Sequence, residues 1–416
     1  MFRKLMTFDE AQKAIEDQFK PAVLGEEEAV LLEAYNRVLS EDVVSTLDIP
    51  PFNRSTVDGY AVKAEDTFGA EENQPVALKV CGIVNVGEQP KVVLAKGEAV
   101  EIVTGAPIPE GADAAVMVED TEREDSELHV FSGVTVNENV MKRGSDIKSG
   151  EVVLKKGRVL GSSEIGVLAA LGLTKVKVSK IPIVAVLSTG GEVIEPGKVL
   201  PAGKIYDINA YSLSTAVIES GAKPVYFGVV PDDKAALSKA LQTALASADM
   251  VITSGGVSVG PRDYTPQIVD SLGKPGIVVY GIAVKPGKPT TVGFVGDKPV
   301  FSLPGHPTSA LLIFYLLARP LIQRLAGRPA AGMRMVRAVA GARMFSAKGR
   351  RTFVMVKLEF DKDCRLIAEP VETGASGAIT TLAKADGFVE IPENEQFLDV
   401  DEEVAVVLFR NVSGKV

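Results

Sequence analysis

The sequence has few of the residues that form cross-links or bind soft metals. Its 416 residues include only two cysteines, Cys81 and Cys364, and two histidines, His129 and His306. The cysteines lie far apart and form no CxxC pair, which excludes a disulfide framework and a thiolate metal cluster and fits a reducing compartment. Two histidines are too few for a His-rich zinc site or for paired-histidine chemistry.

The chain also lacks a basic excess and a long apolar run. Lys and Arg number 45 against 54 Asp and Glu, a formal net charge of −9, which argues against a sequence-independent nucleic-acid binder. The first residues carry no apolar run typical of a signal peptide. The longest apolar stretch, residues 310–318, is too short to span a bilayer. We expect a soluble, cytoplasmic protein that binds neither nucleic acid nor a membrane.

The N-terminal part of the chain mixes helices with a β-rich region. Thr7 and Glu10 form a capping-box pattern that predicts a helix to about Lys20, and a second short helix is predicted between Ala29 and Leu39. Short apolar runs separated by turns predict strands within residues 60–136. We interpret the acidic segment 119–127 as a solvated hairpin tip, and a helix is predicted over 162–171.

Residues 180–325 have a different pattern, in which apolar runs alternate with helical stretches. Strands are predicted at 183–187, 225–230, 250–252, 277–283 and 300–301, and helices at 209–219, 233–246, 265–272 and 308–325. Strands that are apolar on both faces indicate a mostly parallel sheet covered on both sides by helices. From about residue 335 onward, strand-like runs predict a small β domain.

Polar loops follow each predicted strand of the α/β region. Ligands of open α/β sheets bind beyond the carboxyl ends of the strands, so these loops are the candidate site. They are residues 188–192, 231–233, 254–263, 285–289 and 304–309. Each loop contains glycine, a hydroxyl, a carboxylate or a lysine. Loops that only connect strands to helices would rarely all share this composition.

Two of these loops suit anions. Glycines in Ser254–Gly260 let backbone amides approach a phosphate, although the loop is neither a GxGxxG motif nor a P-loop and could be a simple tight turn. Lys285 and Lys288 are held by Pro286 and Pro289 in a stiff loop, which suits an oxyanion. A solvated turn is the alternative for the lysines.

Carboxylates near a phosphate loop imply a divalent cation. Glu192, Asp232 and Asp263 would repel a phosphate unless Mg²⁺ lay between them. Asp232 has an alternative role as the cap of the next helix, and Asp207 has the same alternative before the helix that begins at Asn209. His306 is interpreted as structural or as lying at a substrate's edge, and His129 as a surface residue.

Taken together in this order, the loops resemble those of the molybdopterin molybdenumtransferases, the MoeA proteins of bacteria and archaea and the E domain of gephyrin. The resemblance covers nearly the whole chain and rests on a colinear set of segments. These are residues 51–61 (PFNRSTVDGYA), 104–109 (TGAPIP) with 111–113, 144–147 (GSDI), 188–190 (STG), 254–258 (SGGVS) with Asp263 and Tyr264, 285–289 (KPGKP) and 304–307 (PGHP).

The resemblance implies an elongated homodimer whose subunits have four domains. A discontinuous linker and dimerisation domain would comprise residues 1–50 and 138–178, with a β-rich domain inserted at 51–137. An α/β molybdopterin-binding domain would cover 179–327, and a β-barrel-like domain 328–416. The expected fold is therefore multidomain α/β plus β.

The resemblance also implies the reaction, which is insertion of molybdate into adenylylated molybdopterin with release of AMP and with Mg²⁺ as cofactor. It places the pterin substrate against Thr189, Glu192, Asp207, Ser254, Gly255 and Gly256, Mg²⁺ near Asp232 and Asp263, and molybdate against Lys285, Lys288, Ser309, Arg350 and Ser376. Asp58, Thr104 and Asp146 would line the cleft, contributed by the partner subunit. Asp263, Asp232, Glu192, Asp58 and Asp146 are the expected catalytic carboxylates.

Several points stay open at this level. Met141 stands where many relatives have Arg, so a phosphate contact there would need Lys142 or Arg143, and the choice between Arg350 and Arg351 is unresolved. Tungstate could replace molybdate. Alternatives are the adenylyltransferase of the same pathway, whose domain resembles residues 180–325, and a non-catalytic scaffold like gephyrin. Other cofactor-biosynthesis proteins are candidate partners.

Overall fold

The computed structural model describes residues 5–21, 24–256, 264–329, 332–371 and 379–409. The chain divides into two compact units, considered separately below. The first comprises residues 1–40, 157–161 and 175–416, and the second comprises residues 41–156 and 162–174. None of the helices in the described ranges is both long enough and apolar enough to cross a membrane.

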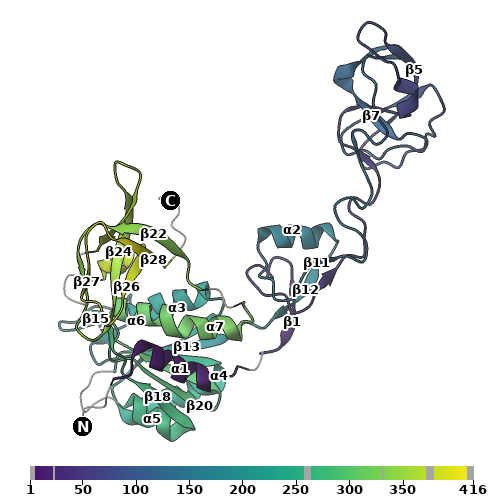
Figure 1. Ribbon diagram of the computed structural model, residues 1–416. Helices are drawn as coiled ribbons and strands as arrows, with labels where there is room; N and C mark the ends of the chain where they lie inside the picture. The colour runs from purple at the N-terminus through teal and green to yellow at the C-terminus, as the bar shows by residue number, and fades with distance from the viewer. Residues whose placement is uncertain (1–4, 22–23, 257–263, 330–331, 372–378, 410–416) are drawn as a thin grey trace. The chain divides into compact units, whose positions relative to one another are not determined.

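The first unit contains a six-stranded sheet in the order β16-β13-β17-β21-β20-β18. Figure 1 labels its strands β13, β18 and β20. Strands β16, β13, β17 and β21 are parallel, and β20 is antiparallel to both β21 and β18. Five of the six strands therefore run in one direction, which confirms the predicted mostly parallel sheet. The bounds are β13 Ile183–Thr189, β16 Lys223–Val230, β17 Met250–Ser254, β18 Pro275–Tyr280, β20 Thr291–Val295 and β21 Lys298–Leu303.

Strand β20 was not predicted from the sequence. It forms a hairpin with β21, in which Val295 pairs with Lys298 across a turn made by Gly296 and Asp297. Gly296 has φ +65°, a conformation that glycine adopts without a steric penalty in tight hairpin turns. The Gly-Asp pair was the signal for this strand, and it makes the sheet mixed rather than purely parallel.

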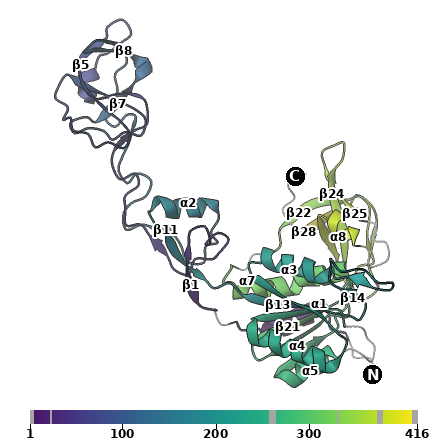
Figure 2. The same cartoon turned by 180° about the vertical axis from the view of Figure 1, so that it is seen from behind.

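Alternate residues of the central strands pack against helices on opposite faces. Val184 and Val186 pack with the cluster that includes α1 Phe8–Gln18, α3 Asn209–Glu219, α6 Pro307–Ile313 and α7 Arg319–Leu325. Ala185 and Leu187 pack on the other face with α4 Lys234–Ser247 and α5 Thr265–Leu272. Both faces of the sheet are therefore buried, as a continuous apolar run predicts. Figure 2 shows the same layers from behind.

The N-terminal helix forms as predicted, but the second short helix does not. In α1 the Glu10 amide donates to Thr7 Oγ1 over 3.2 Å and the Thr7 amide donates to Glu10 Oε2 over 2.8 Å, a complete capping box. The helix predicted over 29–39 is wrong. Strand β1 (Glu26–Val30) instead pairs with β12 (Lys175–Ser179), which places Glu28 opposite Lys177. Cross-strand charge pairs of this kind favour the strand over a helix.

The C-terminal segment of the first unit forms a closed ring of five strands. These are β22 Met335–Ala340, β24 Arg351–Phe360, β25 Leu366–Pro370, β26 Gly387–Ile391 and β28 Glu403–Leu408, with the short helix α8 Thr380–Lys384 before β26. Strand β24 pairs with both β25 and β26, which closes the ring through β22 and β28. The predicted β-barrel-like domain is confirmed. Strand β19 (Val284–Lys285) extends this sheet by pairing with the start of β24.

The second unit is β-rich, as predicted. Its main sheet has the order β7-β4-β6-β5-β9-β8. The acidic segment forms the β8–β9 hairpin with exposed carboxylates, which confirms its interpretation as a solvated tip. The bounds are β4 Gly59–Val62, β5 Val76–Val84, β6 Glu98–Ile102, β7 Ala114–Met117, β8 Thr121–Glu124 and β9 Glu127–Val130; the shorter elements are β2 Val43–Val44, β3 Arg54–Ser55, β10 Val140–Met141, β11 Val152–Leu154 and α2 Ser162–Ala170.

Candidate functional site

The loops after four strands of the α/β sheet meet at one edge. Because β13, β16, β17 and β21 are parallel, their carboxyl ends share that edge. The Gly255 amide donates to the Leu303 carbonyl oxygen over 3.2 Å, which joins the loops after β17 and β21. The Gly191 amide donates to Asp232 Oδ2 over 3.2 Å, which joins the loops after β13 and β16. The edge is thus a connected set of turns.

Two glycines of the β17 loop pass directly over Thr189. Gly255 has φ +90° and Gly256 has φ +67°, so both occupy the left-handed region. A Cβ on Gly256 would lie 2.7 Å from Thr189 Oγ1, and a Cβ on Gly255 would collide with the Thr189 carbonyl oxygen. The loop therefore requires glycine for close approach, which argues against a simple surface turn. Residues 257–263, including the predicted site residue Asp263, lie outside the described residues.

A buried hydroxyl group lies beneath these glycines. Thr189 is 4% exposed, and its Oγ1 has no hydrogen-bond partner within the described part of the chain. Ser254, which is also buried, accepts a hydrogen bond on Oγ from Asn209 Nδ2 over 2.6 Å. A buried hydroxyl without a partner is rare in native proteins and often marks a place that a ligand or water completes.

Neighbouring aspartates before α4 have different roles. Asp233 caps this helix, because its Oδ1 accepts a hydrogen bond from the Ala236 amide over 2.8 Å. Asp232 is exposed and turns its carboxylate to the Gly191 amide instead. The alternative in which Asp232 caps the helix is therefore wrong. Because Asp233 already caps α4, the carboxylate of Asp232 remains at the edge of the sheet.

The carboxylate of Asp207 is used by the protein itself. Asp207 is 4% exposed, with Oδ1 accepting from the Ala210 amide over 3.0 Å and Oδ2 accepting from the Tyr226 hydroxyl over 2.9 Å. Burial, followed by this hydrogen bond, raises the pKa of Tyr226. The structure thus gives Asp207 a helix-capping and bracing role. Glu192, by contrast, is exposed beside Gly190.

The donor chemistry at this edge suits Mg²⁺. Asp232 and Glu192 are exposed carboxylates, and Mg²⁺ is commonly bound by one or two carboxylates together with phosphate oxygens and water. Within the described ranges, no three His, Cys, Asp or Glu side chains gather into a metal-binding group. Two exposed carboxylates fit an ion whose coordination is completed by phosphate oxygens and water.

The lysine loop packs on helix α6. Lys285 and Lys288 are exposed, whereas Gly287 is buried with φ +113° and a Cβ there would lie 2.5 Å from Ile313 Cδ1. The Thr290 hydroxyl donates to the Gly287 carbonyl oxygen over 2.7 Å, which closes the turn. Ser309 lies four residues before Ile313, on the same face of α6. The lysine loop and Ser309 therefore share one side of this helix.

Only one of the two candidate arginines is engaged by protein carboxylates. Arg351 Nη1 and Nη2 donate to the two oxygens of Asp9 over 2.8 and 2.9 Å, Nε donates to Glu393 over 3.1 Å, and the guanidinium lies over the Phe8 ring. The Arg350 side chain makes no hydrogen bond or ion pair within the described part of the chain. Of the pair, Arg350 is the guanidinium available to a ligand. Ser376 lies outside the described residues.

Two of the three predicted residues in the second unit come together. Asp58 Oδ1 accepts from the Thr104 amide over 2.6 Å and from its hydroxyl over 2.9 Å. These hydrogen bonds, the amide first, lower the pKa of Asp58. Asp146 is exposed, and no hydrogen bond in the described ranges joins it to Asp58.

The structure also shows the surroundings of Met141, the residue that stands where many relatives have Arg. Met141 Sδ lies 3.2 Å from the Arg54 guanidinium, in the strand pair β3–β10. Arg143 Nε donates to Asp48 Oδ2 over 2.7 Å, so its charge is already paired. Lys142 is exposed and has no such partner among the residues that the structure describes. Lys142 is therefore the freer of the two proposed substitutes.

One site residue, Asn209, was missed by sequence analysis. It begins α3, is 8% exposed, and its Nδ2 donates to Ser254 Oγ and to the Gly305 carbonyl oxygen over 2.6 and 2.7 Å. It thereby bridges the loops after β17 and β21. The only signal was its place two residues after Asp207, where it was interpreted simply as the start of a helix.

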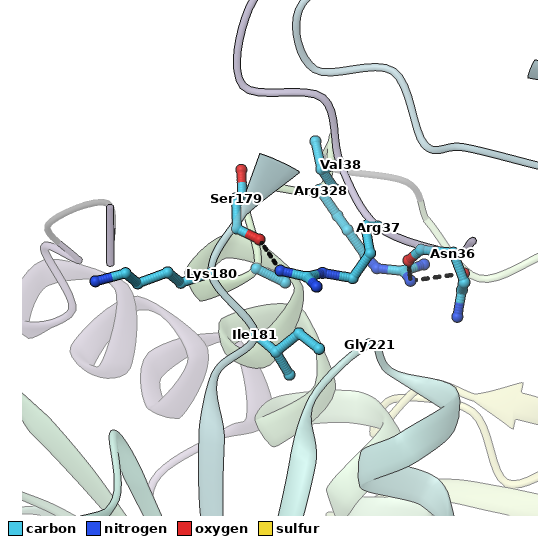
Figure 3. A pocket seen from close by; sticks show the side chains of 9 residues that line it. Asn36, Arg37, Val38, Ser179, Lys180, Ile181, Gly221 and Arg328 are labelled. Atoms are coloured by element: carbon cyan, nitrogen blue, oxygen red, sulfur yellow. Dashed lines mark hydrogen bonds between the residues drawn. The ribbon is translucent and has the colours of Figure 1, made fainter. Parts of the chain in front are cut away.

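A small basic hollow lies elsewhere in the first unit and is already satisfied by protein oxygens (Figure 3). Arg37 Nη2 donates to the Ser179 carbonyl oxygen over 2.7 Å, and Arg328 Nη2 donates to the carbonyl and side-chain oxygens of Asn36, each over 2.7 Å. Burial lowers the pKa of Arg328. We interpret this hollow as a brace around Asn36 rather than as a ligand site.

Family models match three consecutive regions of the chain. Residues 6–172 match the MoeA N-terminal region (domain I and II), residues 185–324 match a model described as a probable molybdopterin binding domain, and residues 337–409 match the MoeA C-terminal region (domain IV). The three matches run in the same order as the segments described above and span both units.

Curated relatives and solved structures match over nearly the full length. The molybdopterin molybdenumtransferase of Haemophilus influenzae is 33% identical over 412 residues, which is 99% of this chain and 100% of that protein. The molybdopterin molybdenumtransferase of a Nostoc species is 35% identical, covering 91% of this chain and 87% of that protein. Two crystal structures of MoeA proteins from Pyrococcus horikoshii each cover 98% of this chain and 100% of theirs, with 44% and 32% identity and TM-scores of 0.83 and 0.81.

Proposed function

This chain belongs to the MoeA family of molybdopterin molybdenumtransferases and acts in molybdenum cofactor biosynthesis, and from that premise we propose that it inserts molybdate into adenylylated molybdopterin with release of AMP. The observation that carries the proposal is the connected edge of the α/β sheet. There, Gly255 and Gly256 lie over the Thr189 hydroxyl, which has no hydrogen-bond partner among the described residues, in the same unit as an exposed two-lysine loop.

The residues at the glycine loop suit the phosphates of an adenylylated pterin. Glycine lets the backbone approach a phosphate closely, and the Thr189 hydroxyl can donate a hydrogen bond to it. Lys204 already donates to the Gly191 carbonyl oxygen at the same edge, which brings a cation close by. Asp232 and Asp263 would hold Mg²⁺, which supplies positive charge to the phosphoanhydride when bound. Glu192 is the further carboxylate at this edge.

Lys285, Lys288, Ser309 and Arg350 form the proposed oxyanion seat, with Ser376 as the remaining expected member. Molybdate is a compact dianion, and fixed cations and hydroxyl donors stabilise such a charge without reorganising at the moment of reaction. The backbone of Lys285 pairs with the start of β24, so the lysine loop and the arginine loop are held by one sheet. By holding the oxyanion beside the dithiolene of the pterin, the site would promote the reaction through proximity and orientation.

The matches outside the central region favour the transferase over the adenylyltransferase. The adenylyltransferase hypothesis needs only a domain like residues 180–325, whereas both the N-terminal and C-terminal regions match MoeA models as well. The exposed lysines and the Arg350 side chain, which has no partner among the described residues, also argue against a purely non-catalytic scaffold, because a scaffold needs no oxyanion donors.

The assembly we propose is a cytoplasmic homodimer with four domains per subunit. The boundaries remain 1–50 with 138–178, 51–137, 179–327 and 328–416. Asp58, Thr104 and Asp146 would be supplied by the partner subunit. Size measurement by light scattering tests the dimer, and mixing of two variants, assayed at a molybdate concentration at which each alone has little activity, tests the shared site. Recovery of activity on mixing Asp58→Asn with Lys288→Ala subunits would support shared sites, and no recovery in mixed dimers would contradict them.

The experiment that tests the function is direct. Purified protein is incubated with adenylylated molybdopterin, Mg²⁺ and either molybdate or tungstate, and AMP and metal-loaded pterin are measured. Oxyanion-dependent release of AMP is expected. Consumption of ATP with unadenylylated pterin would instead support the adenylyltransferase, and loss of neither substrate would support a scaffold. The two oxyanions compared at equal concentration give the preference between them.

A further inference from the structure

We propose that Asn209 is a positioning residue for binding of the adenylylated substrate. Its side chain sets the spacing between the loop after β17 and the loop after β21. Its side-chain amide donates hydrogen bonds to both loops. The inference rests on the proposed function, since it assigns these loops to the adenylylated substrate.

The contacts of Asn209 fix the orientation of its amide. Nδ2 donates to Ser254 Oγ over 2.6 Å and to the Gly305 carbonyl oxygen over 2.7 Å. If the amide were flipped, Oδ1 would face the carbonyl oxygen of Gly305, and two acceptors would repel each other. Both N–H donors of the amide are therefore committed to the two loops.

The other end of the amide is not used. Asn209 Oδ1 is buried and has no hydrogen-bond partner within the residues that the structure describes. Buried polar atoms without a partner are uncommon, and the hydrogen bonds that this side chain does make all come from Nδ2 within the described residues. The start of α3 does not need the Asn209 side chain, because Asp207 Oδ1 already accepts the Ala210 amide in its first turn.

The position of the loops depends on this link. Ser254 precedes Gly255 and Gly256, and the Gly255 amide donates to the Leu303 carbonyl oxygen close to Gly305. The Gly305 backbone lies against Gly255, since a Cβ on Gly305 would be 3.8 Å from Gly255 Cα. Without Nδ2, the links between these loops among the described residues are the strand pairing that ends at Ser254 and Leu303, the Gly255 backbone bond, and a long contact of 3.4 Å from Ser254 Oγ to the Pro304 carbonyl oxygen. The glycine loop would then shift over Thr189.

The test compares Asn209→Ala, Asn209→Asp and the control Thr215→Ala. Aspartate has the shape of asparagine and is well tolerated in the first turn of a helix, but it cannot donate to Gly305. Thr215 lies on the exposed side of α3, and its hydroxyl bonds only to backbone oxygens of that helix. The control therefore removes a hydrogen bond from α3 without touching the loops.

Two readouts are measured. In the absence of substrate, hydrogen exchange at the Gly255 amide should be faster in both Asn209 variants and unchanged in Thr215→Ala. With substrate, the KM for adenylylated molybdopterin should rise about tenfold, while the molybdate concentration for half-maximal rate stays unchanged. The melting temperature of each variant is measured as well, so that a raised KM in a variant still folded at the assay temperature separates positioning from folding.

The outcomes are distinguishable. If exchange at Gly255 and the KM are both unchanged in Asn209→Asp, the inference is overturned. If Asn209→Ala does not fold, Asn209→Asp decides. Failure of the wild type to turn over adenylylated molybdopterin would count against the proposed function, and the exchange comparison, which uses no substrate, would still decide the role of Asn209.

Discussion

At the scale of single residues, identical side chains one position apart have separate tasks. Asp233 holds the first turn of α4, and Asp232 faces the Gly191 amide at the edge of the sheet. The backbone turn before α4, not the residue type, assigns these tasks. A substitution of Asp233 should therefore change stability and not AMP release, and a substitution of Asp232 should do the reverse.

We expect Asp233→Ala to lower the free energy of unfolding by about 1 kcal/mol, because a helix cap is lost, with AMP release nearly unchanged. Asp232→Asn should slow Mg²⁺-dependent AMP release while altering stability little. Urea denaturation and an AMP assay on both variants measure the two effects. A stability loss in Asp232→Asn equal to that in Asp233→Ala would show that the roles are not separate.

The carboxyl of Asp58 gives a pH-dependent prediction. Its pKa is lowered by the Thr104 hydrogen bonds, so its contribution to stability is fully present above the ordinary Asp pKa of about 3.9 and is lost as the pH falls through the lowered value. Thr104→Val removes the hydroxyl donor and should move the Asp58 pKa upward, towards the ordinary value. Carboxyl-carbon NMR titration measures it; an unmoved pKa would contradict the hydrogen-bond explanation.

Lys288 gives a prediction about the oxyanion. Lys288→Ala should raise the molybdate concentration for half-maximal rate about tenfold, because one charge-assisted donor is removed, and should leave the KM for the pterin nearly unchanged. Lys239→Ala, on the exposed face of α4, is the matched control. Equal molybdate dependence in the two variants would remove Lys288 from the oxyanion seat.

At the scale of elements, the glycine loop is defined by one close approach. Gly256 and Gly296 have nearly the same φ, +67° and +65°, but a Cβ on Gly256 would lie 2.7 Å from Thr189 Oγ1, whereas a Cβ on Gly296 would meet nothing within 4 Å. Alanine at Gly296 therefore introduces backbone strain alone, whereas alanine at Gly256 introduces backbone strain and a collision with Thr189.

We expect Gly296→Ala to cost about 1 kcal/mol from backbone strain alone, with activity retained. Gly256→Ala should cost more than this and should also weaken binding of the adenylylated pterin, because Thr189 must move. Thermal denaturation and substrate titration of both variants measure the difference. Equal losses in both properties would mean that the contact with Thr189 has no role.

Most elements of the α/β region follow from local patterns, and the misses have non-local causes. A continuous apolar run such as Val184 to Leu187 indicates a strand that is buried on both faces, so it can be predicted from the sequence. Strand β1 depends on β12, about 150 residues later in the chain, so its own acidic residues could not reveal it. The role of Asn209 depends on Ser254 and Gly305, which only the fold brings to it. The loops could be predicted as a site, but the residue that links them could not.

At the scale of the whole first unit, Arg351 links the two ends of the chain. It pairs with Asp9 in α1 and with Glu390 and Glu393 of the barrel, and its side chain is 15% exposed. Burial is the main cause that raises the pKa of Glu390, and the charge of Arg351 opposes it. Removing the guanidinium would leave three carboxylates near one another without a cation.

Arg351→Met should therefore lower the free energy of unfolding by about 2 kcal/mol at neutral pH. Arg337→Met, which breaks the highly exposed pair with Glu403, should cost about 0.5 kcal/mol or less. Because the Glu390 pKa should rise further without Arg351, the deficit of Arg351→Met should shrink as the pH falls towards 4. Denaturation at pH 7 and pH 4.5 measures both; a deficit that is constant with pH would contradict the assignment to unpaired carboxylates.

Strand β19 has a consequence for selecting variants in the laboratory. The lysine loop is anchored to the barrel, since Lys285 lies opposite Thr352 and the Arg351 amide donates to the Ala283 carbonyl oxygen over 3.0 Å. The pterin contacts that we propose belong to other loops. A library confined to the first residues of β24 could thus evolve discrimination between tetrahedral metal oxides while sparing recognition of the organic half of the substrate.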